Sequence, residues 1–212
     1  SNIGVCNVPD PRLEHINTFI KAEKLVYATM DIVDIPGLAK GASHGEGIGN
    51  SFLADVRLCD ALIHVLRCFE NPGLPHVEGS IDPVKDIEII DFELQVKDLE
   101  QIERKMLKVE KAMKAGERNA KRDYEVLQKY RAHIADFQNV RTLEVTPEER
   151  EVVADLLLLT EKPQLFVCNV NDEDAVEGNQ YVEQVKEYLK DHASDMLVDV
   201  PNTKLHMNHN LH

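Results

Sequence analysis

Short apolar runs and longer helical repeats alternate along the chain. Residues 27–35, 61–68 and 164–168 are nearly continuous apolar runs bounded by turn residues, and this pattern predicts buried β-strands. A last short strand is predicted at residues 196–200, and residues 52–57 have the spacing of a short helix. A strand, a helix and a strand in this order predict a parallel α/β sheet.

Two long helices are predicted between residues 82 and 137. Apolar residues three or four apart run through residues 96–113, and the same spacing resumes through residues 124–137. Gly116 lies between the two repeats and predicts a short turn, so the helices are expected to form an antiparallel hairpin. The sequence therefore predicts a coiled-coil-like arm inserted into the α/β core.

Shorter helices complete the predicted architecture. Residues 12–21 and 181–192 have helical spacing, and Thr146-Pro147 begins a helix whose apolar face is supplied by residues 152–159. No complete element is expected before Val5.

Composition excludes several classes of protein. The net charge of −14 argues against a surface built throughout for nucleic acid, and no DNA partner is expected. No apolar run reaches transmembrane length and no signal-peptide pattern opens the chain, so no membrane partner is expected. The four cysteines lack C-x-x-C spacing and are typical of free thiols in a reducing compartment. A cytoplasmic protein is the resulting expectation.

The predicted arm differs in charge from the rest of the chain. Between Arg104 and Arg131 there are ten basic residues and four acidic ones. Arg104, Lys108, Lys111 and Arg118 are expected near one helical face, where they would contact RNA phosphates. A solvated helix face also favours Lys and Arg, and that alternative stays open.

An acidic residue and a glycine follow the first predicted strand. Asp34 ends the run at residues 27–35, and Gly37 comes three residues later. A carboxylate at a strand end can hold a Mg²⁺-bound water, and a glycine N–H can approach a terminal phosphate without a Cβ in the way. A plain turn at the end of the strand is the alternative.

Four segments together resemble one family. They are D-I-P-G-L-A-K-G-A-S-H-G-E-G-I-G-N from residue 34, H-V-L-R-C-F-E-N from residue 64, H-V-E-G-S-I-D-P from residue 76 and N-V-N-D from residue 169. The residues of these motifs and their order along the chain are similar to those of the YchF/Obg-like ATPases, a family of P-loop NTPases, over residues 2 to about 200. The resemblance implies a G-domain-like, mostly parallel α/β fold with an inserted helical arm. It also implies Mg²⁺-dependent hydrolysis of ATP in preference to GTP, and association with the ribosome or ribosomal RNA.

Two parts of the family pattern do not occur in these 212 residues. The phosphate-binding motif G-x-x-x-x-G-K-[ST] is absent, and in the family it lies just upstream of the position that matches residue 1. The C-terminal TGS domain of the family is absent as well. The sequence is therefore interpreted as a truncated or incompletely represented copy, for which catalysis by the chain alone is uncertain.

The resemblance assigns roles on the phosphate side of the site. Asp34 matches the residue that contacts Mg²⁺ through water, and Gly37 matches the one that binds the γ-phosphate. Leu38 stands where Ras-type GTPases carry the Gln that orients the attacking water, and a leucine cannot bind water. His76 matches the family histidine that takes over this task and is the candidate catalytic residue. A solvated loop histidine is the alternative for His76.

The resemblance also assigns a base-binding loop. Asn169, Val170 and Asp172 match the N-K-x-D motif of GTPases, with Val170 in place of the lysine that packs along the base. An aspartate in the last position pairs with the N1–H and N2–H₂ donors of guanine, which adenine lacks. The family usually has Glu there, so Asp172 leaves GTP open as the substrate.

These observations define one principal hypothesis and one alternative. The principal hypothesis is a ribosome-associated, Mg²⁺-dependent purine-nucleotide hydrolase, with a core at residues 1–85 and 143–200, an arm at 86–142 and a non-native or disordered tail at 201–212. The alternative is a non-catalytic module that docks on RNA or protein through its basic arm.

Overall fold

The computed structural model describes residues 2–34, 56–71, 73, 79–190 and 196–201, the last of these in backbone only. The chain divides into two compact units, residues 1–38 and residues 39–212, and each is described by itself. The domain boundaries expected from the sequence stay a prediction.

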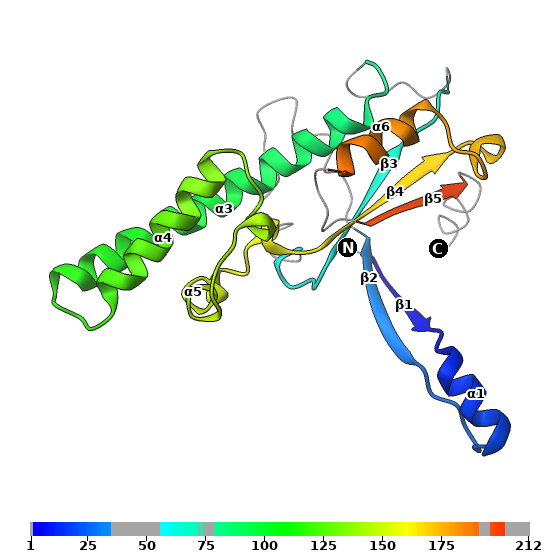
Figure 1. Ribbon diagram of the computed structural model, residues 1–212, viewed down its shortest axis with the longest axis horizontal. Coiled ribbons are helices and arrows are strands. Elements are labelled where there is room, and N and C mark those ends of the chain that lie inside the picture. The colour runs from blue at the N-terminus through cyan, green and yellow to red at the C-terminus, as the bar shows by residue number, and fades with distance from the viewer. Residues whose placement is uncertain (1, 35–55, 72, 74–78, 191–195, 202–212) are drawn as a thin grey trace. The chain divides into compact units, whose positions relative to one another are not determined.

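The first unit is a two-stranded antiparallel ribbon with one helix. Strand β1 (Asn2–Val8) pairs with β2 (Ala28–Asp34), and helix α1 (Pro11–Phe19) connects them (Figure 1). Helix α1 begins at Asp10, whose carboxylate accepts a hydrogen bond of 2.9 Å from the backbone N–H of Arg12.

The pairing and the burial predicted for residues 27–35 are wrong. Strand β2 forms in the expected place, but it pairs with the antiparallel β1, which begins before Val5. Met30 and Ile32 are 49% and 38% exposed. A ribbon of two strands has no second layer of its own, and α1 buries no residue, so apolar side chains on both strands stay open.

The second unit contains a parallel sheet. Its strands β3 (Leu62–Arg67), β4 (Gln164–Val170) and β5 (Met196–Pro201) lie in that order, which confirms the positions of three predicted strands. The burial predicted for residues 61–68 is only partly right, since Ile63 and Val65 on one face of β3 are 48% and 49% exposed. Helix α6 (Gln180–Leu189) connects β4 to β5 and packs with the start of α3 over the strands (Figure 1). Fully buried residues from these elements form one core, namely Leu66, Ile87, Phe166, Val170, Val182 and Val185. The fold is mixed α/β, with two small sheets and one long helix pair.

The predicted helical hairpin is present. Helix α3 (Pro83–Lys114) and α4 (Ala120–Ala135) run antiparallel beside each other (Figure 1). Asp82 caps α3 through its side chain, and Gly116 in the turn has φ of +79°. Ile102 of α3 lies in one buried cluster with Leu127, Tyr130 and Ile134 of α4.

The apolar repeat is imperfect at both ends. Val96 is 36% exposed, because this part of α3 precedes the contact with α4. Phe137, expected on the apolar face of the second helix, lies beyond the end of α4 with φ of +56° and is 68% exposed. The spacing of residues therefore predicted the helices correctly and overestimated how far the seam extends.

The helix after Thr146 is much shorter than predicted. Helix α5 (Pro147–Glu151) begins with a capping box between Thr146 and Glu149, as its sequence indicates, but ends after five residues. The chain then forms two 3₁₀ turns, η4 (Ala154–Leu156) and η5 (Leu159–Glu161). Residues 152–159 are therefore not the face of a continuous helix, and three of their four buried residues, Val152, Val153 and Leu158, join the hairpin core. Two further 3₁₀ turns are η3 (Val140–Thr142) and η6 (Asp172–Asp174).

Buried carboxylates attach α3 to the chain that follows the hairpin. Asp98 is fully buried, and its two oxygens accept hydrogen bonds from the backbone N–H groups of Leu159 and Thr160, at 2.9 and 2.7 Å. The Thr160 hydroxyl and the Arg57 guanidinium also bind Asp98, at 2.9 and 3.4 Å. Burial raises the pKa of the Asp98 carboxyl, and these hydrogen bonds counteract that effect.

Asp91 forms a second buried network nearer the sheet. Its two oxygens accept hydrogen bonds from Asn139, at 2.8 Å, and from Gln164 at the start of β4, at 3.2 Å. The Arg141 guanidinium donates to Gln164 at 2.7 Å and lies 3.7 Å from Asp91. Helix α3 is thus tied by side chains both to the sheet and to the end of the hairpin.

A half-buried histidine on β3, whose ring Nδ1 is fully buried, makes stability depend on pH. The Nδ1 atom of His64 is buried and has no hydrogen-bond partner among the described residues, and burial lowers the pKa of His64 to about 4. In the unfolded chain a histidine has a pKa of about 6.5, so stability present above that pH is lost as the pH falls towards 4. Between pH 7 and 5 the free energy of unfolding of the unsubstituted protein is expected to fall by about 2 kcal/mol more than that of a His64→Gln variant. Urea unfolding at both pH values measures this difference, and equal losses would contradict it.

Candidate functional site

The carboxyl ends of β3 and β4 lie side by side, and the predicted base-binding residues lie at this end of β4 and in the loop after it. Asn169 and Val170 end β4, and Asp172 follows one residue later in η6. Val170 is fully buried and Asp172 is exposed. Cys68, just past β3, donates its backbone N–H to the carbonyl of Asn169 at 2.8 Å. In open parallel sheets ligands bind at this edge, so the loop after β4 is placed where a ligand would reach it.

Asn179 organises this edge, although it is not among the site residues predicted from the sequence. Its Nδ2 donates to the carbonyl of Cys68 at 2.7 Å and to the Asp174 carboxylate at 2.9 Å. Its Oδ1 accepts from the backbone N–H groups of Tyr181 and Val182, at 3.0 and 3.2 Å, and so caps α6. One side chain therefore joins the end of β3, the loop after β4 and the start of α6. The sequence does contain a signal for this helix cap, because Asn179 comes directly before residues with helical spacing.

A second contact closes the same edge. The Tyr181 hydroxyl donates to the Glu70 carboxylate at 2.6 Å, and this hydrogen bond raises the pKa of Tyr181. The Arg67 guanidinium donates to the carbonyl of Phe69 at 3.2 Å and lies 5.0 Å from the centre of the Phe69 ring. These contacts order the segment after β3 up to Asn71, whose carbonyl also accepts from Arg67 at 3.5 Å.

The phosphate side of the predicted site is described only at Asp34. This residue ends β2 and is exposed, opposite Asn2 in the ribbon. Gly37, Leu38 and His76 lie outside the described residues. In the described ranges no three His, Cys, Asp or Glu side chains gather in a group that could hold a metal ion.

The predicted basic residues are exposed, but they do not share one helix. Arg104, Lys108 and Lys111 lie on α3, whereas Arg118 lies in the turn between α3 and α4. Arg104 is 3.7 Å from Glu100 of the same helix. Lys108, Lys111 and Arg118 make no ion pair within the part of the chain that the structure describes.

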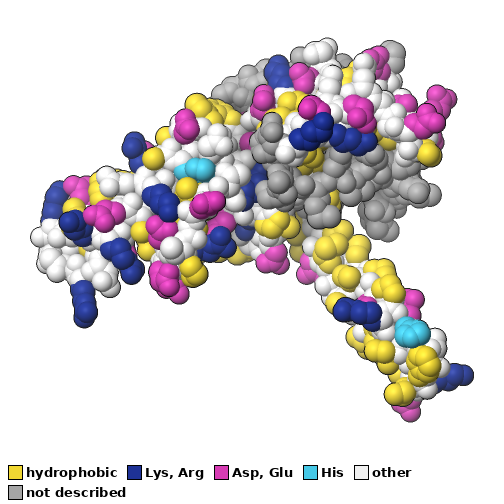
Figure 2. Space-filling view, in the orientation of Figure 1, with side chains coloured by type: hydrophobic (Ala, Val, Ile, Leu, Met, Phe, Trp, Pro, Cys, Tyr) yellow, Lys and Arg dark blue, Asp and Glu magenta, His cyan; other side chains and the backbone are white. Residues whose placement is uncertain are grey.

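Most other cations of the hairpin are neutralised locally. Figure 2 shows Lys and Arg side chains interspersed with acidic ones over the outer half of the hairpin. Six ion pairs account for this, namely Lys105–Asp155, Lys114–Glu110, Lys121–Glu125, Arg122–Asp123, Lys129–Glu149 and Arg131–Glu103. The excess positive charge is therefore concentrated at Lys108, Lys111 and Arg118.

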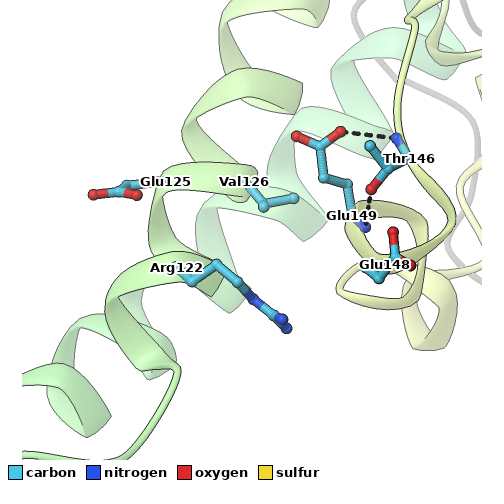
Figure 3. A pocket seen from close by; sticks show the side chains of 6 residues that line it. All are labelled: Arg122, Glu125, Val126, Thr146, Glu148 and Glu149. Carbon is cyan, nitrogen blue, oxygen red and sulfur yellow. Dashed lines mark hydrogen bonds between the residues drawn. The ribbon is translucent and has the colours of Figure 1, made fainter.

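Two shallow hollows flank the hairpin. One, of about 330 Å³, is lined by Arg104, Lys105 and Lys108 of α3 and by Asp155. The other, of about 300 Å³, lies between α4 and α5 (Figure 3). In Figure 3 the Glu149 carboxylate is turned towards Thr146 and accepts a hydrogen bond from its backbone N–H, while the Thr146 hydroxyl accepts one from the backbone N–H of Glu149. Because that carboxylate already accepts a hydrogen bond in the cap of α5, we assign no function to the second hollow.

Comparison with known proteins identifies the family. The family model of the 50S ribosome-binding GTPases matches residues 13–114. The ribosome-binding ATPase YchF of Escherichia coli O157:H7 is 42% identical over 186 residues, which cover 88% of this chain and 51% of that protein. The YchF protein of Bacillus subtilis is 36% identical over 199 residues, which cover 93% of this chain and 54% of that protein. The chain belongs to the YchF family.

A solved YchF structure agrees with this assignment. The structure of the Schizosaccharomyces pombe YchF GTPase superposes with a TM-score of 0.81 at 31% identity, over 95% of this chain and 56% of that chain. The family resemblance inferred from the four motifs is thus confirmed. The chain spans about half the length of the curated YchF relatives that it matches. Among the described residues, no helix is long and apolar enough to cross a membrane.

Proposed function

We propose that this chain supplies the switch and base-binding parts of a ribosome-associated, Mg²⁺-dependent purine-nucleotide hydrolase. The observation that carries the proposal is the loop Asn169–Asp172 at the carboxyl end of β4, the central strand of the parallel sheet. Asn179 joins Asp174, two residues after that loop, to the end of β3 and the start of α6, and this favours preorganised base-binding groups. The bacterial YchF relatives are named ribosome-binding ATPases, which supports the same activity here.

The roles of the other predicted residues follow from their chemistry. Asp34 is an exposed carboxylate at a strand end, the kind of oxygen donor that holds a Mg²⁺-bound water. When bound, Mg²⁺ neutralises charge on the phosphates. Gly37 would donate its N–H to the terminal phosphate, and His76 would orient the attacking water because Leu38 cannot.

ATP is the proposed substrate, and Asp172 is where this proposal can be tested. Bacterial relatives are named ATPases, whereas the fission yeast relative is titled a GTPase. If Asp172 pairs with guanine, Asp172→Asn should weaken GTP binding about tenfold and leave ATP binding within about twofold. Titration with fluorescent ATP and GTP analogues measures both affinities. A native protein that binds GTP more tightly than ATP would contradict the assignment.

The titration also separates catalysis from simple docking. The motif G-x-x-x-x-G-K-[ST] does not occur in the 212 residues, so two proteins are compared, this chain and a version in which such a loop precedes it. Hydrolysis by the longer protein supports the proposed function. If neither protein binds nucleotide below millimolar concentration, a docking module is the better account. Lys108, Lys111 and Arg118, which have no ion pair among the described residues, favour it.

Charge reversal tests the proposed ribosome contact. A Lys108→Glu/Lys111→Glu variant is expected to lose at least tenfold in ribosome co-sedimentation, since each lysine that contacts a phosphate adds about one unit to the salt dependence of binding. The matched control is Lys21→Glu/Lys24→Glu, which changes the net charge equally at exposed positions of the first unit. Unchanged binding by the first variant, or equal loss by the control, would exclude these lysines as the contact.

A further inference from the structure

Two exposed phenylalanines stack at the base of the hairpin. Phe92 on α3 is 50% exposed and Phe137, just beyond α4, is 68% exposed. Their ring centres are 6.0 Å apart, with 29° between the planes. Val96, one turn further along α3 and 36% exposed, extends the apolar surface. Neither the nucleotide site nor the basic residues of the hairpin use this pair.

The backbone at Phe137 is unfavourable for a large side chain. Its φ of +56° lies in the left-handed region, which bulky L-residues rarely adopt. The N–H of Phe137 donates to Ile134 at 3.0 Å and that of Gln138 donates to His133 at 3.2 Å, the pattern that usually ends a helix on glycine. A glycine here would keep both hydrogen bonds, so closing the helix does not by itself explain an exposed aromatic ring.

Buried side chains fix the position of this strained residue. Gln95 donates to the carbonyl of Phe137 at 3.2 Å and to the Asn139 side chain at 2.8 Å. Asn139 in turn donates to Asp91 at 2.8 Å, and all three side chains are buried. The ring of Phe137 is therefore presented to solvent by an ordered support, and strained residues with such support are concentrated at binding sites.

Two exposed acidic residues lie next to the pair along the chain. Glu88 is exposed and precedes Phe92 by one helical turn on the same side of α3. Asp136 is exposed and directly precedes Phe137. Carboxylates at these two positions repel phosphate and attract cations. An arginine matches both features, because its planar guanidinium stacks on aromatic rings while it binds carboxylates.

We propose that Phe92 and Phe137, with Glu88 and Asp136, form a docking site for an arginine-bearing apolar segment of a protein partner. This surface is distinct in charge and in residues from Lys108, Lys111 and Arg118. Its occupant is a protein segment and not RNA. The site does not depend on the proposed nucleotide hydrolysis.

NMR of phenylalanine ring signals in the ¹³C-labelled protein provides the test. The probes are a synthetic decapeptide of alternating Leu and Arg, the same peptide with Glu in place of Arg, and a single-stranded RNA decamer. The Arg peptide is expected to shift the Phe92 and Phe137 signals at submillimolar concentration, while the Glu peptide and the RNA do not. Phe92→Gln/Phe137→Gly removes both reporting rings, so its affinity is measured by isothermal titration calorimetry, in which the Arg peptide should bind at least tenfold more weakly than to the unsubstituted protein. The unfolding midpoint of this variant should not fall.

Matched variants separate specific docking from attraction to an acidic protein. Glu88→Gln/Asp136→Asn should weaken the Arg peptide about fivefold, and Glu144→Gln/Glu151→Gln, with the same change of net charge at exposed positions, should not. Three results would overturn the proposal. They are equal weakening by both pairs, stronger shifts with RNA, and ring shifts that depend on protein concentration alone, which would indicate a second copy of the chain.

Discussion

Replacing Asp98 with asparagine is expected to lower the free energy of unfolding by about 3–4 kcal/mol. Asp98 is fully buried on α3 and accepts hydrogen bonds at both oxygens, from Leu159 on one and from Thr160 on the other. An asparagine must turn its NH₂ group towards one of these N–H groups, whichever way the amide is oriented. The Arg57 guanidinium, which is 3.4 Å from Asp98, would lose its carboxylate as well.

Urea unfolding at pH 7, followed by circular dichroism, measures this loss. The matched control is Asp60→Asn, which makes the same chemical change at an exposed position and should alter stability by less than about 0.5 kcal/mol. A loss below about 1 kcal/mol at Asp98 would show that the hairpin base relaxes around the amide. In that case Asp98 would not be what holds α3 to the 3₁₀ turn η5.

Replacing Asn179 with alanine is expected to weaken nucleotide binding about tenfold and to lower stability by about 2 kcal/mol. The alanine removes the cap of α6 and both hydrogen bonds from Nδ2, which go to Cys68 and Asp174. The chain at Asp174 then loses its side-chain link to β3, although the backbone hydrogen bond from Cys68 to Asn169 stays, and we expect the base-binding groups to be less ordered before the ligand binds.

An Asn179→Ser variant separates these two effects. Serine keeps an oxygen that can cap α6, but it cannot reach Cys68 and Asp174 together as a donor to both. We expect Asn179→Ser to recover most of the stability while nucleotide affinity stays low. Binding is measured by titration with the fluorescent nucleotide analogues, at a temperature where circular dichroism shows both variants folded. Recovery of affinity together with stability would show that Asn179 acts only as a helix cap.

The sequence predicted an element well where the spacing of its apolar residues matches the contacts that the element makes in the fold. Strand β4 is apolar on both faces and is buried along most of its length, and such a run is typical of a buried strand. Strand β3 was placed correctly by the same pattern, but only one of its faces is covered, since Ile63 and Val65 are 48% and 49% exposed. Helix α3 has an acidic cap, a proline in its first turn and apolar residues at helical spacing, so its start and its course were both predictable.

The errors arose where the outcome depends on contacts between distant segments. The run at residues 27–35 is as apolar as β3, but its burial depends on what covers it, and the sequence does not contain that information locally. The helix after Thr146 ends at Glu151, and after the 3₁₀ turn η4 the chain bends at Leu157, whose φ of +48° no propensity of leucine indicates. Phe137 was misplaced for the same reason.

The candidate site was predicted by residue type better than by arrangement. Asn169, Val170 and Asp172 were found because a polar loop after a buried strand has a recognisable motif. The role of Asn179 was missed because its partner Cys68 lies 111 residues away in the sequence. The local charge balance of the hairpin was also hidden, since acids such as Asp155 and Glu149 come from outside it.

Helix α3 gives the molecule the mechanics of a lever. It is a single helix of 32 residues, held near one end by contacts with the sheet and free of it at the other. At a rise of 1.5 Å per residue it is about 48 Å long, so a tilt of about 5° at the sheet would displace the far tip by about 4 Å. A shift of α3 by less than about 1 Å beside β3 and β4 would therefore move the basic tip of the hairpin by about the width of a side chain.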